Sequence, residues 1–384
     1  MLIKMKKALK MILIVFLIII VLIVGAIFLI SRFIGNITNR PEIIQNPKIG
    51  EWYRITPDGA ISSDGSQWHG LFRKGSENKV IVYFYGGGVS TDAYMAARPE
   101  GTEVGFYNPK LTNDGLEAMG IGSSDANNPF KDWTMLVLPY STGDWHCGTG
   151  EFRYTDAYGS EKTLYHHGYT NYTLFMQEAM EYIGTPDELL ITGFSGGGFA
   201  AALLGNDTIS RYFPSVKNTT VFAEASFLLN ENWRDIVENV WQAPDKISER
   251  LVSDNIVLDS LRALSKDHPE TKILFSSSVR DNALSSYQNY YTNGVLETSN
   301  EIGNVYQENL KLMVKDLQSI PNTGILIWDG YNDKKDSNLT GHTLMFMPMF
   351  YSDSLHGITM AEWVMNGING NVGNHGLDLL EKQY

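Results

Sequence analysis

The chain has 384 residues, of which 43% are hydrophobic and 19% charged, a composition typical of a globular protein with a substantial core. Its single cysteine, Cys147, excludes an intramolecular disulfide and a cysteine-based metal cluster. The formal charge of −13 is unevenly distributed, because residues 1–40 contain six basic residues and no acid, whereas the remainder has a formal charge of −19. We therefore do not expect the remainder to bind nucleic acid or an anionic membrane surface.

The N-terminus carries a long apolar run. Residues 11–30 are 20 apolar or small residues, which as a helix span about 30 Å of hydrocarbon. Four lysines precede the run and only Arg32 and Arg40 follow closely, so the positive-inside bias keeps residues 1–10 in the cytoplasm. We predict a basic tail (1–10), a transmembrane signal-anchor helix (11–30), a spacer (31–48) and an extracytoplasmic domain (49–384) of a single-pass cell-membrane protein. A cleaved signal peptide is the alternative, but its apolar region is expected to be only about 7–15 residues long.

From Glu51 onward, short apolar runs alternate with helical stretches, which predicts an α/β fold with a mainly parallel sheet flanked by helices. The expected strands are continuous apolar runs, as in parallel strands buried on both faces, and they cover residues 80–85, 134–139, 189–192, 219–223, 272–276 and 324–328. The expected helices cover residues 172–183, 199–204, 235–264, 305–317 and 358–368. In open α/β sheets the chemistry sits at the carboxyl ends of the strands. The residues that follow these strands are therefore the candidates for a site.

A small-residue turn follows the strand expected at 189–192. Residues 193–198 (GFSGGG) match the G-x-S-x-G pattern of a nucleophile elbow, a sharp turn between a strand and a helix. We expect strained backbone angles at Ser195, with no room for bulky neighbours two residues away. The following helix would direct free N–H groups, including that of Gly196, at a developing oxyanion. A glycine-rich turn with a bystander serine is the alternative, and the apolar strand before the pattern favours the elbow.

A second glycine cluster, at residues 86–88, directly follows the strand expected at 80–85. The loop after the third strand is where the other half of an oxyanion hole is expected in this arrangement. Glycines there let the backbone approach a substrate carbonyl and donate N–H groups to it. We predict Gly87 and Gly88 as donors, together with Gly196, and a flexible turn is the alternative.

The acid is expected between the serine and the base along the chain. Asp281 follows the strand expected at 272–276 across a short loop, which is the required place. Its alternative role is that of an N-cap for the next helix. Asp329 and Asp333, after the last strand, are the competitors, but they lie too close to the loop that is expected to carry the base.

The base is expected shortly after the last strand. His342 follows the strand expected at 324–328 by one loop and is the predicted base, with His356 before the terminal helix as the second choice. In this arrangement the histidine takes the proton of Ser195 and later gives it to the leaving alcohol, while the carboxylate fixes its tautomer.

Another polar segment follows the strand expected at 134–139. Asp144, Trp145 and His146 are candidates for lining the pocket, although we favour an interpretation in which they shape a loop by side-chain hydrogen bonds. The pair His166 and His167 resembles half of a zinc site. Third and fourth ligands at suitable spacing are missing from the sequence, so we predict no metal and no organic cofactor.

Taken together, these segments resemble the pectin acetylesterase and Notum family, in its bacterial branch. The resemblance runs in order from residue 79 to 369, and its motifs are residues 85–88 (YGGG), 142–146 (TGDWH), 167–171 (HGYTN), 193–198 (GFSGGG), 341–344 (GHTL) and 357–363 (GITMAEW). It implies an α/β-hydrolase that deacylates esters, with Ser195, Asp281 and His342 at the triad positions. Plant and animal members are rich in cysteine and carry a tryptophan after the glycine loop, where this chain has Val89.

We therefore predict that residues 49–384 form the catalytic domain of a carboxylic-ester hydrolase that acts outside the membrane through an acyl-enzyme. The expected substrate is an O-acetyl group on a cell-surface or environmental polysaccharide, and the formal charge of −19 disfavours densely anionic pectin. A catalytically silent anchored binding protein on the same fold is one alternative. A lipase or peptidase on this fold is the other.

Overall fold

The computed structural model describes residues 40–112, 115–330 and 338–384. The predicted anchor helix at 11–30 and the first half of the predicted spacer, residues 31–39, lie outside these residues. Within the described ranges, no helix is long and apolar enough to cross a membrane. Residues 42–111 and 116–384 form one compact unit, and it contains every element considered below.

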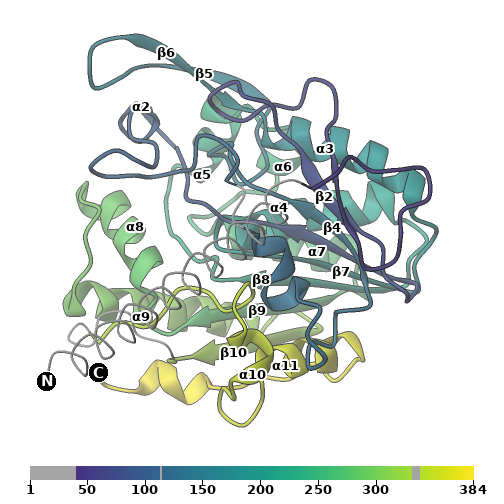
Figure 1. The fold of residues 1–384 in the computed structure, drawn as a ribbon. Helices are drawn as coiled ribbons and strands as arrows, with labels where there is room; N and C mark the ends of the chain where they lie inside the picture. Colours follow the sequence, from purple (N-terminus) through teal and green to yellow (C-terminus); the bar gives the residue numbers. More distant parts are fainter. Residues whose placement is uncertain (1–39, 113–114, 331–337) are drawn as a thin grey trace, which may run out of the picture. The chain divides into compact units, whose positions relative to one another are not determined.

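A large mixed sheet organises this unit (Figure 1). Its strand order is β1-β2-β4-β3-β7-β8-β9-β10, and all pairs from β4 to β10 are parallel, whereas β1 and β2 are antiparallel at one edge. The strands are β1 (Trp52–Ile55), β2 (Gly70–Arg73), β3 (Lys79–Phe84), β4 (Thr134–Leu138), β7 (Glu188–Phe194), β8 (Asn218–Glu224), β9 (Lys272–Ser278) and β10 (Thr323–Trp328). The six strands expected from apolar runs are all present, and the mainly parallel sheet is confirmed.

Helices cover both faces of the sheet (Figure 1). In β8, Val221 lies against Gly205 of α4 (Gly196–Tyr212), whereas its neighbour Phe222 contacts Trp363 of α11 (Met360–Ile368). Adjacent residues of a strand point to opposite faces, so α4 and α11 lie on opposite sides of β8. The other helices of the described residues are α2 (Ala93–Ala96), α3 (Gly168–Ala179), α5 (Trp233–Asp235), α6 (Asp245–Ser248), α7 (Ile256–Asp267), α8 (Asn282–Asn293), α9 (Asn300–Leu317) and α10 (Met349–Ser352), with short 3-10 helices η1 (Leu116–Ala118), η2 (Gly120–Gly122), η3 (Met180–Tyr182) and η5 (Leu377–Glu381).

The helix expected over 235–264 is wrong as one element. The structure divides this stretch into α5, the π-helical η4 (Ile236–Val240), α6 and α7. Pro244 lacks a backbone N–H and stands immediately before α6. The loop before α7 is held by Asp259, which accepts hydrogen bonds from the backbone N–H groups of Val252 and Ser253. A continuous helix is thereby replaced by short segments.

The antiparallel hairpin of β5 (Gly150–Thr155) and β6 (Glu161–His166) was not expected from the sequence. It pairs from Gly150 with His166 to Thr155 with Glu161 and extends away from the main sheet (Figure 1). Most of its side chains are exposed or partly exposed, so it lacks the apolar run that marks a buried strand. The strands that position the site are the buried ones, and their carboxyl ends lie along one edge of the sheet because they run parallel.

Candidate active site

Ser195 lies on a strained turn between β7 and α4. Its backbone angles are φ 54° and ψ −126°, a region that residues with a side chain rarely occupy. A Cβ atom on Gly193 would lie 2.2 Å from the Gly197 carbonyl oxygen, and one on Gly197 would lie 2.0 Å from that of Phe84. Side chains two residues before and after Ser195 are therefore sterically excluded, as the elbow pattern predicts.

The glycine loop after β3 lies directly against this turn. A Cβ atom on Gly86 would lie 2.7 Å from the Cβ of Ser195 and 3.0 Å from the backbone nitrogen of Gly196. Gly88 has a φ of 80°, and a Cβ there would lie 1.9 Å from the Phe106 carbonyl oxygen. Gly196 is the first residue of α4, where backbone N–H groups have no partner within the helix. The predicted loop and helix terminus are thus brought together, and Gly86, which we did not predict, makes the closest approach.

Asp281 and His342 are joined by a short hydrogen bond. His342 Nδ1 lies 2.7 Å from Asp281 Oδ2, and the Asp281 side chain is fully buried. The other oxygen of Asp281 accepts hydrogen bonds from the backbone N–H groups of Ala283 at 3.0 Å and Leu284 at 2.8 Å, which makes Asp281 the N-cap of α8. The N-cap interpretation and the acid interpretation therefore hold together, because each carboxylate oxygen has its own partners.

The electrostatic environment of His342 favours its protonated form overall. Burial lowers the pKa of the imidazole, but the negative charge and hydrogen bond of Asp281, with a smaller contribution from Glu224, raise it, and the net pKa lies above the ordinary 6.5. Because Nδ1 is engaged with Asp281, Nε2 is the nitrogen that remains to accept a proton in the neutral ring.

Ser195 and His342 line the same cavity, which has a volume of about 350 Å³. Its wall also includes Gly87 and Gly88. The other lining residues are mostly apolar: Gly86, Phe194, Ala283, Leu284, Tyr287, Thr343, Phe346 and Met347. The structure therefore places a hydroxyl, an imidazole and a glycine backbone around one apolar space, with Asp281 behind the imidazole.

The competing acid and base lie in a different environment. Asp329 accepts hydrogen bonds from Lys382 at 2.6 Å and from the Tyr384 hydroxyl at 3.3 Å, and His356 Nε2 lies 3.8 Å from it. Neither Asp329 nor His356 lines the cavity that contains Ser195. Asp333 lies outside the described residues.

The segment around Asp144 shapes a loop rather than the cavity. Asp144 is fully buried and accepts hydrogen bonds from Thr142, from the backbone N–H groups of His146 and Gly148, and from that of Gly168 at the start of α3. Burial raises its pKa to about 6 against these hydrogen bonds, which lower it. None of Asp144, Trp145 and His146 lines the 350 Å³ cavity, which agrees with the loop-shaping interpretation.

Trp145 and His146 contact the residues next to the turn of Ser195 and the glycine loop. The Trp145 ring stacks on Phe199 of α4 with centroids 3.7 Å apart, next to Gly196. His146 is buried, its Nε2 lies 3.0 Å from the Tyr85 carbonyl oxygen, and burial lowers its pKa to about 4. The two residues therefore fix the backbone beside the nucleophile turn, and His146 is held in its neutral form.

His166 and His167 are not joined to further metal-ligating groups. The Nδ1 of His166 lies 2.9 Å from the Thr142 carbonyl oxygen, and burial lowers its pKa to about 3. Across the part of the chain that the structure describes, no group of three or more His, Cys, Asp or Glu side chains is placed to hold a metal ion.

Glu224 is a site residue that the sequence analysis missed. It ends β8, is fully buried, and accepts hydrogen bonds from the backbone N–H groups of Leu344 at 2.6 Å and Met345 at 3.1 Å. Burial raises its pKa to about 7, and the two backbone donors oppose this rise. Its signal was present in the sequence, because an acidic residue directly follows the apolar run expected at 219–223.

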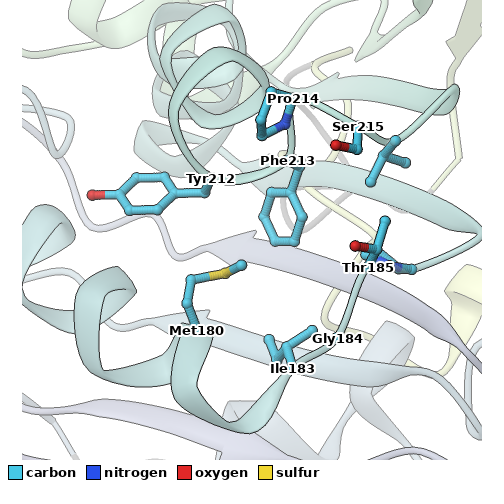
Figure 2. A pocket seen from close by; sticks show the side chains of 10 residues that line it. Met180, Ile183, Gly184, Thr185, Tyr212, Phe213, Pro214 and Ser215 are labelled. Carbon is cyan, nitrogen blue, oxygen red and sulfur yellow. The ribbon is translucent and has the colours of Figure 1, made fainter.

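Other hollows lie at the amino ends of the parallel strands, whereas the cavity of Ser195 lies at their carboxyl ends. One of about 260 Å³ is lined by Met180, Ile183, Phe213 and Tyr212, among others (Figure 2). It lies where η3 and α4 end and where the chain enters β7 and β8, at the amino ends of these strands. It contains no histidine and no acidic residue, so it offers neither a base nor an acid for nucleophilic catalysis.

Comparison with known proteins yields a family and a fold. The model of a family described as pectinacetylesterase matches residues 47–277. Two crystal forms of the Wnt deacylase Notum from Drosophila are similar in structure, each with a TM-score of 0.57 and 14% identity over 83% of this chain, covering 93% and 92% of the Notum chains. This likeness concerns the fold, a large central sheet flanked by helices, and no curated protein matches the chain. Because the family model covers more than half of the 384 residues, the chain belongs to the pectinacetylesterase family.

Proposed function

We propose that the chain is a serine carboxylic-ester hydrolase with an α/β-hydrolase-like catalytic domain, which removes an acyl group from a polysaccharide or a related ester. The observation that carries the proposal is that Ser195, on a strained strand-to-helix turn, lines one cavity with His342, whose imidazole is bonded to the buried Asp281. Membership of the pectinacetylesterase family supports ester hydrolysis.

The geometry supports an acyl-enzyme mechanism. His342, with Nδ1 held by Asp281, takes the Ser195 proton on Nε2 while the serine oxygen attacks the ester carbonyl. Backbone N–H groups of Gly196 and of the loop 86–88 stabilise the oxyanion. The tetrahedral intermediate then collapses, and His342 gives the proton to the leaving alcohol. In the second half, His342 takes a proton from water, which attacks the acyl-serine, and His342 then gives this proton to the Ser195 oxygen as the acid leaves.

The proposed substrate is an O-acetyl ester, in preference to an ester with a longer acyl chain. The family is described as pectinacetylesterase, and Notum, in both crystal forms, is called a deacylase. The formal charge of −19 over residues 41–384 disfavours a densely anionic polysaccharide. A panel of p-nitrophenyl esters from acetate to laurate tests the acyl length: activity confined to acetate supports a deacetylase, and a maximum at long chains supports the lipase alternative.

We also propose that residues 11–30 anchor the protein in the cell membrane with residues 49–384 outside. The support is the length of the apolar run and the lysines before it. Before protease is added, the full chain should be found in the membrane fraction of the cells that express it. Protease added to the intact cells should then degrade the domain. Release into the medium would favour the cleaved signal peptide, and protection from protease would contradict the orientation.

The esterase proposal is tested by turnover of p-nitrophenyl acetate. Wild type should hydrolyse the ester, and Ser195→Ala should lose at least about 10³-fold in kcat. The matched control is Ser215→Ala, because Ser215 is an exposed serine in the hollow of Figure 2, and its activity should equal that of wild type. A folded wild-type protein that turns over no ester in the panel would contradict the proposal and favour the silent binding protein.

A further inference from the structure

Glu224 touches both halves of the site. Its carbonyl oxygen accepts a hydrogen bond of 3.0 Å from the backbone N–H of Ser195. Its carboxylate accepts from the backbone N–H groups of Leu344 and Met345, which follow His342 by two and three residues. One fully buried residue at the end of β8 therefore connects the turn of the nucleophile with the loop of the base.

The loop of the base is held differently before and after His342. Before it, Thr340 pairs with Asp281 in a parallel bridge, and the Ser278 hydroxyl donates to the Gly341 carbonyl oxygen at 2.5 Å. After it, the carboxylate of Glu224 receives the first two backbone N–H groups beyond Thr343. Loss of that carboxylate would leave two buried N–H groups without their acceptor and the far side of the loop unfixed.

We propose that Glu224 is a positioning residue, which fixes the loop that carries His342 relative to the turn that carries Ser195. Glu224 does not line the cavity, so it acts through His342 and not on the substrate. The inference rests on the proposed function, because a displaced imidazole matters most if His342 exchanges a proton with Ser195. A displacement of about 1 Å between reacting groups is enough to slow a reaction about 10²-fold.

The charge of Glu224 adds a signature that a purely mechanical role would lack. The ionisable groups that act on its carboxyl, among the described residues, are His342 and Asp281. In turn, Glu224 contributes to the raised pKa of His342. A glutamine has nearly the same volume but carries no charge, and its one acceptor oxygen can take the place of Oε1, which lies 2.6 Å from the nitrogen of Leu344 and 3.3 Å from that of Met345. Glu224→Gln therefore separates the charge from the hydrogen bonds, and Glu224→Ala removes both.

Asp259 provides a matched control. It is also a buried carboxylate, 3% exposed, and it also accepts two backbone N–H groups, those of Val252 and Ser253, both at 2.7 Å. These hydrogen bonds lie between α6 and α7 and reach no residue of the cavity. Asp259→Ala removes the acceptor of both N–H groups, so it should lower the unfolding temperature and leave kcat unchanged, and it shows what the loss of such an anchor does by structural weakening alone.

The experiment compares the full-length wild type, Glu224→Gln, Glu224→Ala and Asp259→Ala. Their kcat and KM for p-nitrophenyl acetate are measured against pH. The titration of the His342 ring is followed by NMR in chains labelled with ¹³C-histidine, with the signal assigned by its loss in His342→Gln. Glu224→Ala should lose about 10²-fold in kcat with KM changed less than about threefold. Glu224→Gln should keep kcat within about tenfold of wild type and titrate His342 at a lower pH, together with the acid limb of kcat.

The outcomes distinguish this inference from the proposed function. An inactive wild type whose His342 still titrates at a lower pH in Glu224→Gln would end the hydrolase proposal and keep the link between Glu224 and His342. An unchanged His342 titration in Glu224→Gln, together with a kcat of Glu224→Ala no lower than that of Asp259→Ala, would overturn the inference. Glu224→Gln keeps the test valid if Glu224→Ala fails to fold.

Discussion

The carboxyl ends and the amino ends of the parallel strands form two edges of the main sheet, here called the carboxyl edge and the amino edge. These two edges differ in their residues, and the larger hollow does not lie at the edge that holds Ser195. The amino edge holds the hollow of Figure 2 and a larger one of about 550 Å³ next to the start of β8 and β9, whereas the cavity at the carboxyl edge measures about 350 Å³. The carboxyl edge holds the strained turn of Ser195 and the buried acids Asp144, Glu224 and Asp281. Several residues with side chains have positive φ there, among them Trp145, His146, Ser195 and Ala225, whereas Asn322 has a positive φ at the amino edge.

Backbone strain and buried carboxylates lower the free energy of unfolding unless the surroundings compensate. A strained residue costs about 1–3 kcal/mol, and burial raises the pKa of Glu224 to about 7 and that of Asp144 to about 6. Strain and buried carboxylates next to the cavity of Ser195 favour this edge as the candidate site, although the larger hollow lies at the other edge. If this is correct, changes at the carboxyl edge should alter activity more than stability, and changes at the amino edge should not alter activity.

The largest effect is expected at Ser195. Ser195→Gly should lose at least about 10³-fold in kcat because the nucleophile is gone. It should also raise the free energy of unfolding by about 1–2 kcal/mol, because glycine adopts a φ of 54° without the steric cost that a side chain pays. Urea unfolding of wild type, Ser195→Ala and Ser195→Gly measures this gain. Equal stability of Ser195→Ala and Ser195→Gly would show that the turn is not strained.

Asp281→Asn should have the next largest effect. Asparagine still caps α8, but it no longer gives the imidazole a carboxylate partner at Nδ1. We expect kcat to fall about 10⁴-fold with an unfolding temperature close to that of wild type. A variant within tenfold of wild-type activity would exclude Asp281 as the acid and return attention to other carboxylates.

The pH profile should show the raised pKa of His342. The base must be neutral to accept the Ser195 proton, so kcat/KM should rise with pH as the imidazole loses its proton. Because Asp281 and Glu224 outweigh burial and raise this pKa, the half-maximal point of the acid limb should lie above pH 6.5. Stability follows the opposite trend, because the protonated imidazole stabilises the fold at low pH and this contribution is lost as the pH rises through the folded pKa. A half-maximal point below pH 6.5 would contradict the assignment.

The smallest effect on activity is expected at the amino edge. The Tyr212 hydroxyl is buried and has no hydrogen-bond partner within the described ranges. Tyr212→Phe removes it, so kcat should stay within about twofold of wild type and the free energy of unfolding should stay equal or rise by up to about 1 kcal/mol. A loss of activity above tenfold in a folded Tyr212→Phe would remove the distinction between the two edges.

The buried parallel strands and the turn at Ser195 were predictable because their physical requirements are local. A buried parallel strand needs a continuous apolar run, and a strained turn in which Gly193 and Gly197 face backbone oxygens at about 2 Å needs glycine. Asp281 and His342 followed from chain order relative to the strands. The hairpin β5–β6 and the division of residues 235–264 were missed, because exposed strands lack such a run and short segments can keep a helical pattern.

Contacts between distant segments could not be read from the sequence. Glu224 and Leu344 are 120 residues apart, and only the order of strands in the sheet brings the end of β8 next to the loop after β10. The same applies to Gly86, whose contact with Ser195 depends on the pairing of β3 with β7. The sequence indicated the candidate residues for the chemistry, whereas the contacts that hold them in place required the structure.

The central claim is that Ser195 is a nucleophile activated by His342. The most direct measurement is reaction of the full chain with a fluorophosphonate, followed by peptide mass spectrometry to locate the adduct. We predict an adduct on Ser195 in wild type, none in Ser195→Ala, and labelling slowed by more than about 10²-fold in His342→Gln. A folded wild type that forms no adduct, or one whose adduct lies on another serine, would contradict the account.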